Sequence, residues 1–256
     1  MRSAADKDHS NNNQTGEQCT LYVYPLPSLA EPALLCGTAA VVIDVLRATS
    51  VFTYATHSGV REIIPVLDVE MAHQLKKNYP PEKVLLGGER LCLPIEGFDL
   101  GNSPQHYTPE RVAGKTLIFT TTNGTAAMHA AKSARAIYLA SFLNARAVTE
   151  CLKNENNIAI LCAGRLGKET EEDSLLAGCL TVRLTQRRNY QLNEAAERVA
   201  RLWQEPMNVA QLERLLRKSG GGKSLVRLGL AADITASAQL DTIDVVPQLD
   251  PKRHLS

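Results

Sequence analysis

Most of the chain repeats one pattern, in which a short apolar run is followed by an amphipathic segment. The runs carry apolar side chains on both faces, which is typical of strands in a sheet covered on both sides. Strands that alternate with helices predict a mostly parallel sheet with right-handed crossover connections. We therefore predict an α/β fold of three layers, α/β/α, around a mostly parallel or mixed sheet. The expected strands are 39–46, 62–67, 83–86, 116–121, 136–140 and 157–163, and the expected helices are 49–58, 69–78, 124–133, 144–153 and 172–187.

The two ends of the chain depart from this pattern. Residues 1–18 are polar and include three consecutive asparagines, so we predict a disordered tail there. Residues 19–256 then form one α/β unit, or two lobes that meet near 97–115, inside a long interval rich in glycine and proline. Towards the C-terminus we expect two helices around Pro206 within 193–217, a loop at 218–224, a short helix at 223–233 and an extended segment at 240–247.

Composition narrows the classes of protein to which this chain can belong. Its 28 basic and 27 acidic residues leave a net charge of +1, which predicts no nucleic-acid partner. No apolar run reaches the ~18 residues of a membrane span, and the N-terminus lacks the apolar core of a signal peptide. The six cysteines have no CxxC spacing, so we expect mostly buried, reduced thiols in a cytoplasmic protein. The oligomeric state is open, with a homodimer as one alternative.

Unusual polar residues gather at the ends of the predicted strands. In an open α/β sheet, ligands bind outside the carboxyl ends of the strands. Four segments at those ends combine small, acidic and basic residues, and we expect the fold to bring them to one edge. Three of the four contribute an arginine, and three contribute a carboxylate. The segments are 44–50 (DVLRATS), 87–90 (GGER), 120–125 (TTTNGT) and 164–174, which begins with Gly-Arg and ends with Glu-Glu-Asp-Ser.

Each segment also has a purely structural interpretation. Asp44 interrupts an apolar strand, and because a buried carboxylate needs a partner, Arg47 could serve as one. Thr122–Thr125 could be a plain turn, although its place between a strand and a helix also suits an anion site. The acids at 171–173 could serve only the helix dipole, and 101–104 is a turn by composition. The functional interpretation is stronger for the whole set, because independent structural roles would not all fall at one sheet edge.

This mixture of residue types favours one kind of ligand. Arginines and backbone N–H groups bind phosphate and other oxyanions. Neighbouring carboxylates would repel such an anion unless a cation lies between them, and oxygen ligands without histidine or cysteine suit Mg²⁺. Three arginines exceed what one phosphate needs, which indicates a second acidic group on the substrate. The strand ends therefore predict a site for Mg²⁺ and a small, phosphorylated and otherwise anionic substrate.

Other phosphate-handling sites are not matched by the sequence. The nearest approach to a P-loop is 220–224 (GGGKS), which no predicted strand precedes. No cysteine has an arginine six positions later, and Leu46 stands where paired-aspartate phosphatases carry their second aspartate. The six histidines are dispersed, and no GxGxxG follows a strand. A metal-assisted phosphate site is the interpretation that remains.

Five ordered motifs resemble the 2-phosphosulfolactate phosphatase family. They are VIDVLRATS (42–50), GGER (87–90), GFDLGNSP (97–104), TTTNGT (120–125), and AGR followed by EED (163–165 and 171–173). The resemblance runs through 40–180 and continues more weakly in the tail, where Gly229-Leu230 and Asp233 precede Asp244-Val245-Val246-Pro247. It implies a phosphoric monoester hydrolase that uses Mg²⁺ to convert 2-phospho-3-sulfolactate to 3-sulfolactate, a step towards coenzyme M. In the family pattern two glycines follow GER, whereas this chain has Leu91-Cys92, a departure that bears on the exact substrate more than on the reaction class.

With this resemblance in place, each candidate residue can be given a role in a catalytic unit. We expect the arginines to bind phosphate, carboxylate and sulfonate in an order left open, and the 122–125 loop to donate N–H groups to one anionic arm. Direct attack by water is favoured over a phosphoaspartate at Asp44, because the second aspartate is missing. The candidate catalytic residues are Asp44, Arg47, Glu89 and Arg90; the candidate metal ligands are Asp44 and Glu89, completed by Glu172 or Asp173; and the candidate substrate-binding residues are Asn102, Ser103, Thr122, Asn123, Gly124, Thr125 and Arg165.

Two other functions stay open at this point. One is a phosphatase that acts on another phosphorylated hydroxy acid, which the sequence does not separate from the first interpretation. The other is a non-catalytic protein that binds anions in the same pocket. The retained carboxylates argue against the second alternative, because a protein that only binds anions gains nothing from buried negative charge.

Overall fold

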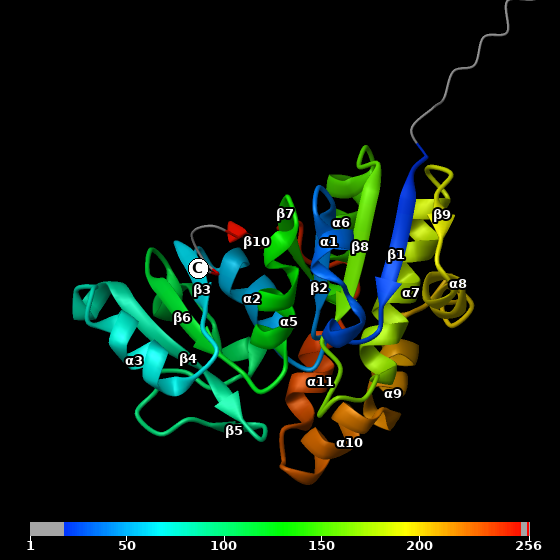
Figure 1. The fold of residues 1–256 in the computed structure, drawn as a ribbon. Helices are drawn as coiled ribbons and strands as arrows, with labels where there is room; N and C mark the ends of the chain where they lie inside the picture. Colours follow the sequence, from blue (N-terminus) through cyan, green and yellow to red (C-terminus); the bar gives the residue numbers. More distant parts are fainter. Residues whose placement is uncertain (1–17, 252–254, 256) are drawn as a thin grey trace, which may run out of the picture.

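The larger of two sheets has six strands and is built around β2, which is buried along its whole length (Figure 1). The structure is a computed structural model that describes residues 18–251 and residue 255. Strand β2 pairs in parallel with β7 on one side and β8 on the other, whereas β10 runs antiparallel to β7. The strand order is β10 (Gln248–Leu249), β7 (Ala136–Ala140), β2 (Ala39–Ile43), β8 (Asn157–Cys162), β1 (Thr20–Tyr24) and β9 (Gln191–Leu192).

A second, smaller sheet lies beside the first and has four strands (Figure 1). Its order is β3 (Glu62–Pro65), β6 (Thr116–Thr120), β4 (Val84–Arg90) and β5 (Leu93–Pro94). The first three are parallel, and β5 folds back antiparallel to β4. The segment 97–115, a predicted meeting point of two lobes, connects β5 to β6 within this sheet and contains η3 (Pro104–His106) and α4 (Pro109–Val112).

Helices cover both faces of the larger sheet, which confirms the predicted three-layer α/β/α fold. Side chains alternate along β2: Val41 and Ile43 pack with α6 to α9, whereas Ala40 and Val42 pack with α2 and α5. The helices are α1 (Pro32–Leu35), α2 (Ala48–His57), α3 (Val69–Lys76), α5 (Gly124–Ala130), α6 (Ala145–Leu152), α7 (Glu171–Thr185), α8 (Glu194–Ala200), α9 (Val209–Lys218), α10 (Gly220–Arg227) and α11 (Ala231–Ser237). Short 3₁₀ turns are η1 (Pro27–Leu29), η2 (Pro81–Lys83), η4 (Ala131–Ser133) and η5 (Phe142–Asn144).

The predicted strands and helices between 39 and 187 are all present, with ends shifted by a few residues. The expectations were wrong at the edges of the sheets. Strand β1, in parallel contact with β8, was not predicted at all, and the extended segment expected at 240–247 is replaced by the two-residue β10. The four polar segments, which were expected at the edge of one sheet, instead lie at the ends of strands of two sheets: β2 and β8 in the larger, β4 and β6 in the smaller. A period-2 or apolar pattern identifies a strand but does not say which sheet receives it.

The C-terminal region differs most from its prediction. The expected loop at 218–224 is the start of α10, and the single helix expected at 223–233 is the end of α10 followed by α11, with Gly229 at φ 75° between them. Ser219 caps α10 by accepting a hydrogen bond from Gly222 N. A Cβ atom at Gly222 would collide with the carbonyl oxygen of Leu216, so this glycine is required for close packing and not for flexibility.

Three remaining predictions concern the tail, the membrane and the thiols. The predicted tail, 1–18, lies outside the described residues except for Gln18. Within the described ranges, no helix is long and apolar enough to cross a membrane. All six cysteines are free, but only Cys162 and Cys179 are buried, so the expectation of mostly buried thiols is wrong.

Candidate active site

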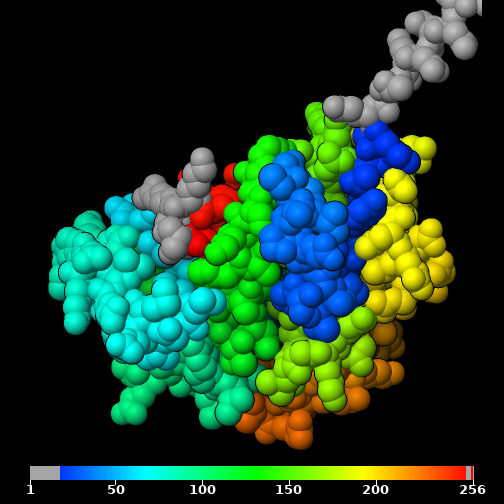
Figure 2. Space-filling view, viewed as in Figure 1, coloured from blue at the N-terminus to red at the C-terminus, as the bar shows by residue number. Residues whose placement is uncertain are grey.

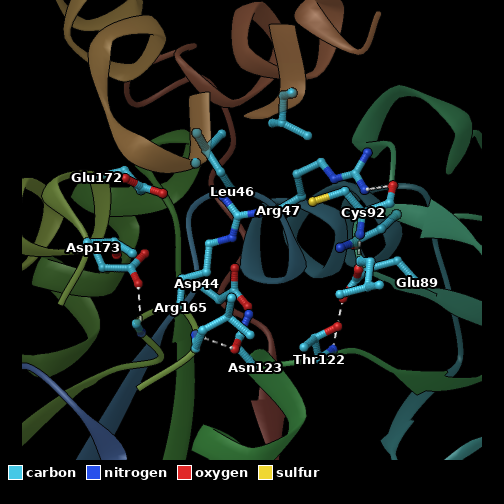
Figure 3. A pocket seen from close by; sticks show the side chains of 17 residues that line it. Asp44, Leu46, Arg47, Glu89, Cys92, Thr122, Asn123, Arg165, Glu172 and Asp173 are labelled. Carbon is cyan, nitrogen blue, oxygen red and sulfur yellow. Dashed lines mark hydrogen bonds between the residues drawn. The ribbon is translucent and has the colours of Figure 1, made fainter. Parts of the chain in front are cut away.

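A small pocket lies where the carboxyl ends of β2 and β8 approach those of β4 and β6, beside the start of α10 (Figure 3). Its volume is about 50 Å³. In Figure 3, Asp44 lies between Asp173 and Glu172 on one side and Glu89 on the other. The four segments selected from the sequence therefore meet in one pocket, although they come from two sheets. The predicted site residues that line it are Asp44, Arg47, Glu89, Asn102, Thr122, Asn123, Arg165, Glu172 and Asp173.

Asp44 follows β2 directly and is the central acid of the pocket. Its Oδ1 accepts a hydrogen bond from Ala48 N at 3.4 Å, at the start of α2. Burial raises the pKa of the Asp44 carboxyl to about 7, and the nearby charges of Glu89 and Glu172 add to this effect. A Cβ atom on Gly124 would lie 2.5 Å from Asp44 Oδ2. Gly124 therefore makes room for this carboxylate, and it does not line the pocket itself.

Glu172 and Asp173 enter from the first turn of α7, and both are buried. Asp173 Oδ1 accepts from Val45 N at 2.9 Å and Oδ2 accepts from Gly164 N at 3.2 Å, so this carboxylate joins the ends of β2 and β8. Burial raises the pKa of both acids. Glu172 Oε2 has no hydrogen-bond partner in the described part of the chain. Asp173 thus holds the backbone, whereas Glu172 keeps an oxygen for a ligand.

Glu89, at the end of β4, joins the smaller sheet to the pocket. Its Oε1 accepts from Thr122 N at 2.8 Å and its Oε2 accepts from Cys92 N at 2.5 Å. The second bond closes a tight turn in which Leu91 and Cys92 have φ values of 53° and 70°. Positive φ favours glycine, so two consecutive non-glycine residues hold a conformation here that side chains rarely adopt. Leu91 is 73% exposed, so its side chain narrows the pocket less than its size suggests.

The structure separates the three candidate arginines. Arg165 lines the pocket and donates from Nη1 to Ser224 Oγ at 2.6 Å, on α10. Arg47 lines the pocket and is ion-paired with Asp233. Arg90 does not line the pocket: it donates to Thr120 Oγ1 and to the Glu89 carbonyl oxygen, each at 2.8 Å. Arg90 therefore braces β4 against β6, and two arginines face the pocket in place of the three expected.

The loop 122–125 has fewer available donors than predicted. Thr122 N donates to Glu89, and Thr125 N donates to Thr121 Oγ1 at 3.2 Å. Asn123 accepts from Leu166 N through its side-chain oxygen at 3.2 Å, which fixes the 164–170 loop. Two of the four N–H groups expected to bind an anion are thus used within the protein. The loop mainly belongs to what we call the frame, the hydrogen-bonded backbone that holds Asp44 and Glu89 in place.

Asn102 and Ser103 are brought to the pocket region by the segment before η3. Asn102 lines the pocket and its side-chain oxygen has no partner among the described residues, which suits contact with a ligand. Ser103 Oγ donates to Asp233 Oδ2 at 3.0 Å and lies outside the pocket lining. Of the two alternatives open from the sequence, Asn102 has the geometry to touch a substrate and Ser103 shapes the loop.

The C-terminal helices contribute parts of the site that sequence reasoning missed. Asp233 on α11 binds Arg47, and Gly221 on α10 lines the pocket against Glu172. A Cβ atom at Gly221 would collide with Glu172 Oε1. The available signal was the GGGKS segment itself, since three consecutive glycines at a helix start indicate close approach of another group. A second signal was the position of an acid, Asp233, between the apolar residues Ala232 and Ile234.

The donor set of the pocket fits a hard cation. Four buried oxygens of residues that line it have no hydrogen-bond partner in the described ranges, namely Asn102 Oδ1, Thr122 Oγ1, Thr170 Oγ1 and Glu172 Oε2. Unpartnered buried oxygens are costly unless a donor or a cation satisfies them. Among the described residues, no three histidine, cysteine or acidic side chains converge as a metal cluster. Oxygen donors of this kind are compatible with Mg²⁺, which binds through one or two carboxylates and keeps several waters.

Comparison with known proteins identifies the family. The sequence profile of 2-phosphosulpholactate phosphatase matches residues 25–252. A protein of Caldanaerobacter subterraneus named probable 2-phosphosulfolactate phosphatase is 40% identical over 82% of this chain and 86% of its own length. Proteins with the same name from Symbiobacterium thermophilum and Thermotoga maritima are 40% and 42% identical, over 83% and 84% of this chain and 91% and 89% of theirs. The chain therefore belongs to the 2-phosphosulpholactate phosphatase family and, as a member, is a phosphoric monoester hydrolase.

Proposed function

We propose that the protein hydrolyses 2-phospho-3-sulfolactate to 3-sulfolactate and phosphate in the cytoplasm, with Mg²⁺ as its cofactor and in support of coenzyme M formation. Family membership and the names of its relatives support the substrate. The observation that carries the proposal is the pocket itself, where four buried carboxylates meet the buried Arg47 and the half-buried Arg165. The alternative substrate is another small phosphorylated hydroxy acid, which would present the same phosphoryl and acid groups.

The charge balance of the pocket supports a cation. Its four acids carry more negative charge than the two arginines offset, and Arg47 already pairs with Asp233. A substrate with phosphate, carboxylate and sulfonate groups would be repelled by such a pocket. A divalent cation between the acids and the phosphoryl oxygens reverses that repulsion. The same reasoning disfavours a protein that only binds anions, because it would bind them better without the acids.

The hydrogen bonds assign different roles to the acids that the sequence grouped as metal ligands. Asp44 and Glu172 are the proposed Mg²⁺ ligands, since each lines the pocket and has a carboxylate oxygen with no N–H donor among the described residues. Glu89 and Asp173 use both carboxylate oxygens on backbone N–H groups, and we propose that they hold those ligands in place. Bound Mg²⁺ would neutralise the phosphoryl oxygens and orient the ester for attack.

The protein's own groups then serve binding and orientation. Arg165 has neutral described partners, Ser224 and the Gly220 carbonyl oxygen, so its charge is available to an acid group of the substrate. Asn102 offers its unpartnered oxygen to a substrate hydroxyl or to metal-bound solvent. We propose that a water oxygen bonds to phosphorus as the P–O ester bond breaks, and that the leaving alkoxide takes up a proton to become the hydroxy acid.

The decisive experiment measures phosphate release from 2-phospho-3-sulfolactate and from a panel of phosphorylated hydroxy acids, with Mg²⁺ and with EDTA. We expect the highest kcat/KM on 2-phospho-3-sulfolactate and loss of activity with EDTA that added Mg²⁺ restores. A higher kcat/KM on a phospho-acid without a sulfonate would assign the alternative substrate. Full activity in EDTA would remove the metal from the proposal.

A further inference from the structure

Arg47 could pair with an acid of the pocket or with Asp233, which is 186 positions away in the chain. It pairs with Asp233. It shares the pocket with Asp44, and its charge is close enough to lower the pKa of that carboxyl. Its described hydrogen bonds nevertheless go elsewhere: Nη1 donates to Asp233 Oδ2 at 2.5 Å, and Nη2 donates to the Cys92 carbonyl oxygen at 2.8 Å. The guanidinium is therefore held between α11 and the turn at Cys92, and no described hydrogen bond joins it to a pocket acid.

Asp233 is built to hold that contact. It lies on α11, is 1% exposed, and uses both carboxylate oxygens. Besides Arg47, it accepts from Ser103 Oγ at 3.0 Å and from Gln105 Nε2 at 2.9 Å. Figure 2 shows the C-terminal helices, in orange, beside the blue-green segment around residues 90–110 at the lower edge of the molecule. Donors from two segments thus fix this carboxylate at one position next to Arg47.

A buried guanidinium must have an anionic partner. Arg47 is 3% exposed, so its charge has little water to solvate it. Without Asp233, the anions at hand are those of the pocket. Asp44 is three residues away in the chain, and Glu89 binds the N–H of Cys92, whose carbonyl oxygen Arg47 already holds. Because an arginine binds a carboxylate through two parallel hydrogen bonds, it would occupy the Asp44 oxygens that a cation needs, or displace the N–H groups that Glu89 holds.

We propose that Asp233 is a positioning residue that holds Arg47 away from Asp44 and Glu89, and so keeps Asp44 available to a divalent cation and Glu89 bonded to the backbone N–H groups of Thr122 and Cys92. The inference rests on the Mg²⁺ site of the proposed function. It gives Asp233 on α11 a role in cation binding, although α11 contains none of the motifs at the strand ends. A purely structural ion pair would stabilise the fold without any effect on cation affinity once the fold is intact.

The test is a double-mutant cycle read out as Mg²⁺ affinity by calorimetry, on the full chain without substrate. The proteins are wild type, Asp233→Asn, Arg47→Gln and the double variant. We expect Asp233→Asn to weaken Mg²⁺ binding about 10-fold or more, as for other residues that orient metal ligands. In the Arg47→Gln background the same change should alter affinity by less than about twofold, because the guanidinium that Asp233 restrains is gone.

Gln105→Ala is the matched control. It removes a donor to the same carboxylate and leaves the ion pair with Arg47, so its Mg²⁺ affinity should stay within about twofold of wild type. Wild-type affinity in Asp233→Asn would overturn the proposal, and so would a loss that persists with Gln at position 47. If Asp233→Asn does not fold, the double variant, in which neither buried charge is left unpaired, is compared with wild type: its Mg²⁺ affinity should be no weaker, because no guanidinium remains to compete for Asp44, and a loss of about 10-fold or more would overturn the proposal.

A crystal structure of Asp233→Asn without added metal separates this inference from the proposed function. We expect the Arg47 guanidinium within hydrogen-bond distance of Asp44 or Glu89. An Arg47 side chain that keeps its wild-type position would reject the positioning role. Failure of the proposed function would appear differently, as wild-type protein that binds no Mg²⁺, and the crystal structure would still decide where Arg47 goes.

Discussion

The two sides of the pocket use the same residue types for different purposes. On the side of the smaller sheet, both oxygens of Glu89 accept backbone N–H groups, from Thr122 and Cys92. On the side of the larger sheet, Glu172 keeps an oxygen without a described partner, and Asp44 accepts one N–H bond at 3.4 Å. A carboxylate saturated by N–H groups holds the frame, whereas one with a vacant oxygen takes a cation or a proton. We infer that binding chemistry concentrates on the side of the larger sheet.

The largest expected effect comes from the central acid of that side. Asp44→Asn keeps the shape of the side chain and removes its charge. We expect phosphate release to fall by about 100-fold or more, because a metal ligand is weakened at the reacting group. Initial rates over a range of Mg²⁺ concentrations measure the loss. Full activity at sub-millimolar Mg²⁺ would show that Asp44 is not a ligand and would break the contrast between the two sides.

The arginines allow the next comparison, since Arg165 faces the pocket and Arg90 braces the smaller sheet. Loss of one charge-assisted contact costs about 1.5–3 kcal/mol, or roughly 10- to 150-fold in rate. We expect Arg165→Lys to lower kcat/KM by that factor on a phospho-acid and to spare a neutral aryl phosphate. Arg90→Lys should affect both substrates equally, because Arg90 acts through the frame. Equal losses for Arg165→Lys would argue against a second anionic arm on the substrate.

Glu89→Gln tests the frame itself and should have a smaller effect than Asp44→Asn. The amide keeps one acceptor oxygen, so one of the two N–H bonds, to Thr122 or Cys92, is weakened. Residues that orient metal ligands typically contribute about 10- to 100-fold, and we expect kcat to fall within that range. Mg²⁺ titrations by calorimetry should show a weaker site that still binds. A loss as large as that of Asp44→Asn would place Glu89 among the ligands.

The strand-end half of the site was predictable from the sequence for a physical reason. Asp44 interrupts a run of apolar residues, and an acid at the end of a buried strand has to meet a partner or a ligand. The topology of parallel strands then brings such ends together. The same reasoning does not reveal which oxygens are saturated by N–H groups. Arg90 next to Glu89 was predicted to bind an acid group of the substrate, yet its side chain turns to Thr120.

The helical half of the site was not predictable in the same way. Asp233 lies in a short helix whose pattern of small and apolar residues says only that one face is buried. Its partners Arg47 and Gln105 are more than 100 residues away in the chain, as the separations of 186 and 128 positions show. The GGGKS segment was expected to be a loop because glycine usually disfavours helices. Tertiary contact with Glu172 and Leu216 overrides that preference.

The smallest expected effect concerns stability, and it follows from the raised pKa of Asp44. In the metal-free protein the pKa of this carboxyl is about 7, against 3.8 for an unperturbed aspartate. The folded protein therefore holds the proton more tightly than the unfolded chain does. The stability that the neutral form contributes is fully present below about pH 4 and is lost as pH rises towards 7.

Asp44→Asn carries a neutral group at every pH, so it should stabilise the metal-free protein more at pH 8 than at pH 5. Each kcal/mol gained corresponds to about 2–4 °C in Tm for a chain of this size. Mg²⁺ should raise the Tm of wild type at pH 8, where Asp44 is ionised, and have little effect on the variant. Differential scanning calorimetry of wild type and variant at both pH values in EDTA, and at pH 8 in Mg²⁺, measures these differences in Tm. An equal gain at both pH values would mean that Asp44 is already ionised at pH 5, and the larger-sheet side would then hold its acids as firmly as the smaller-sheet side holds Glu89.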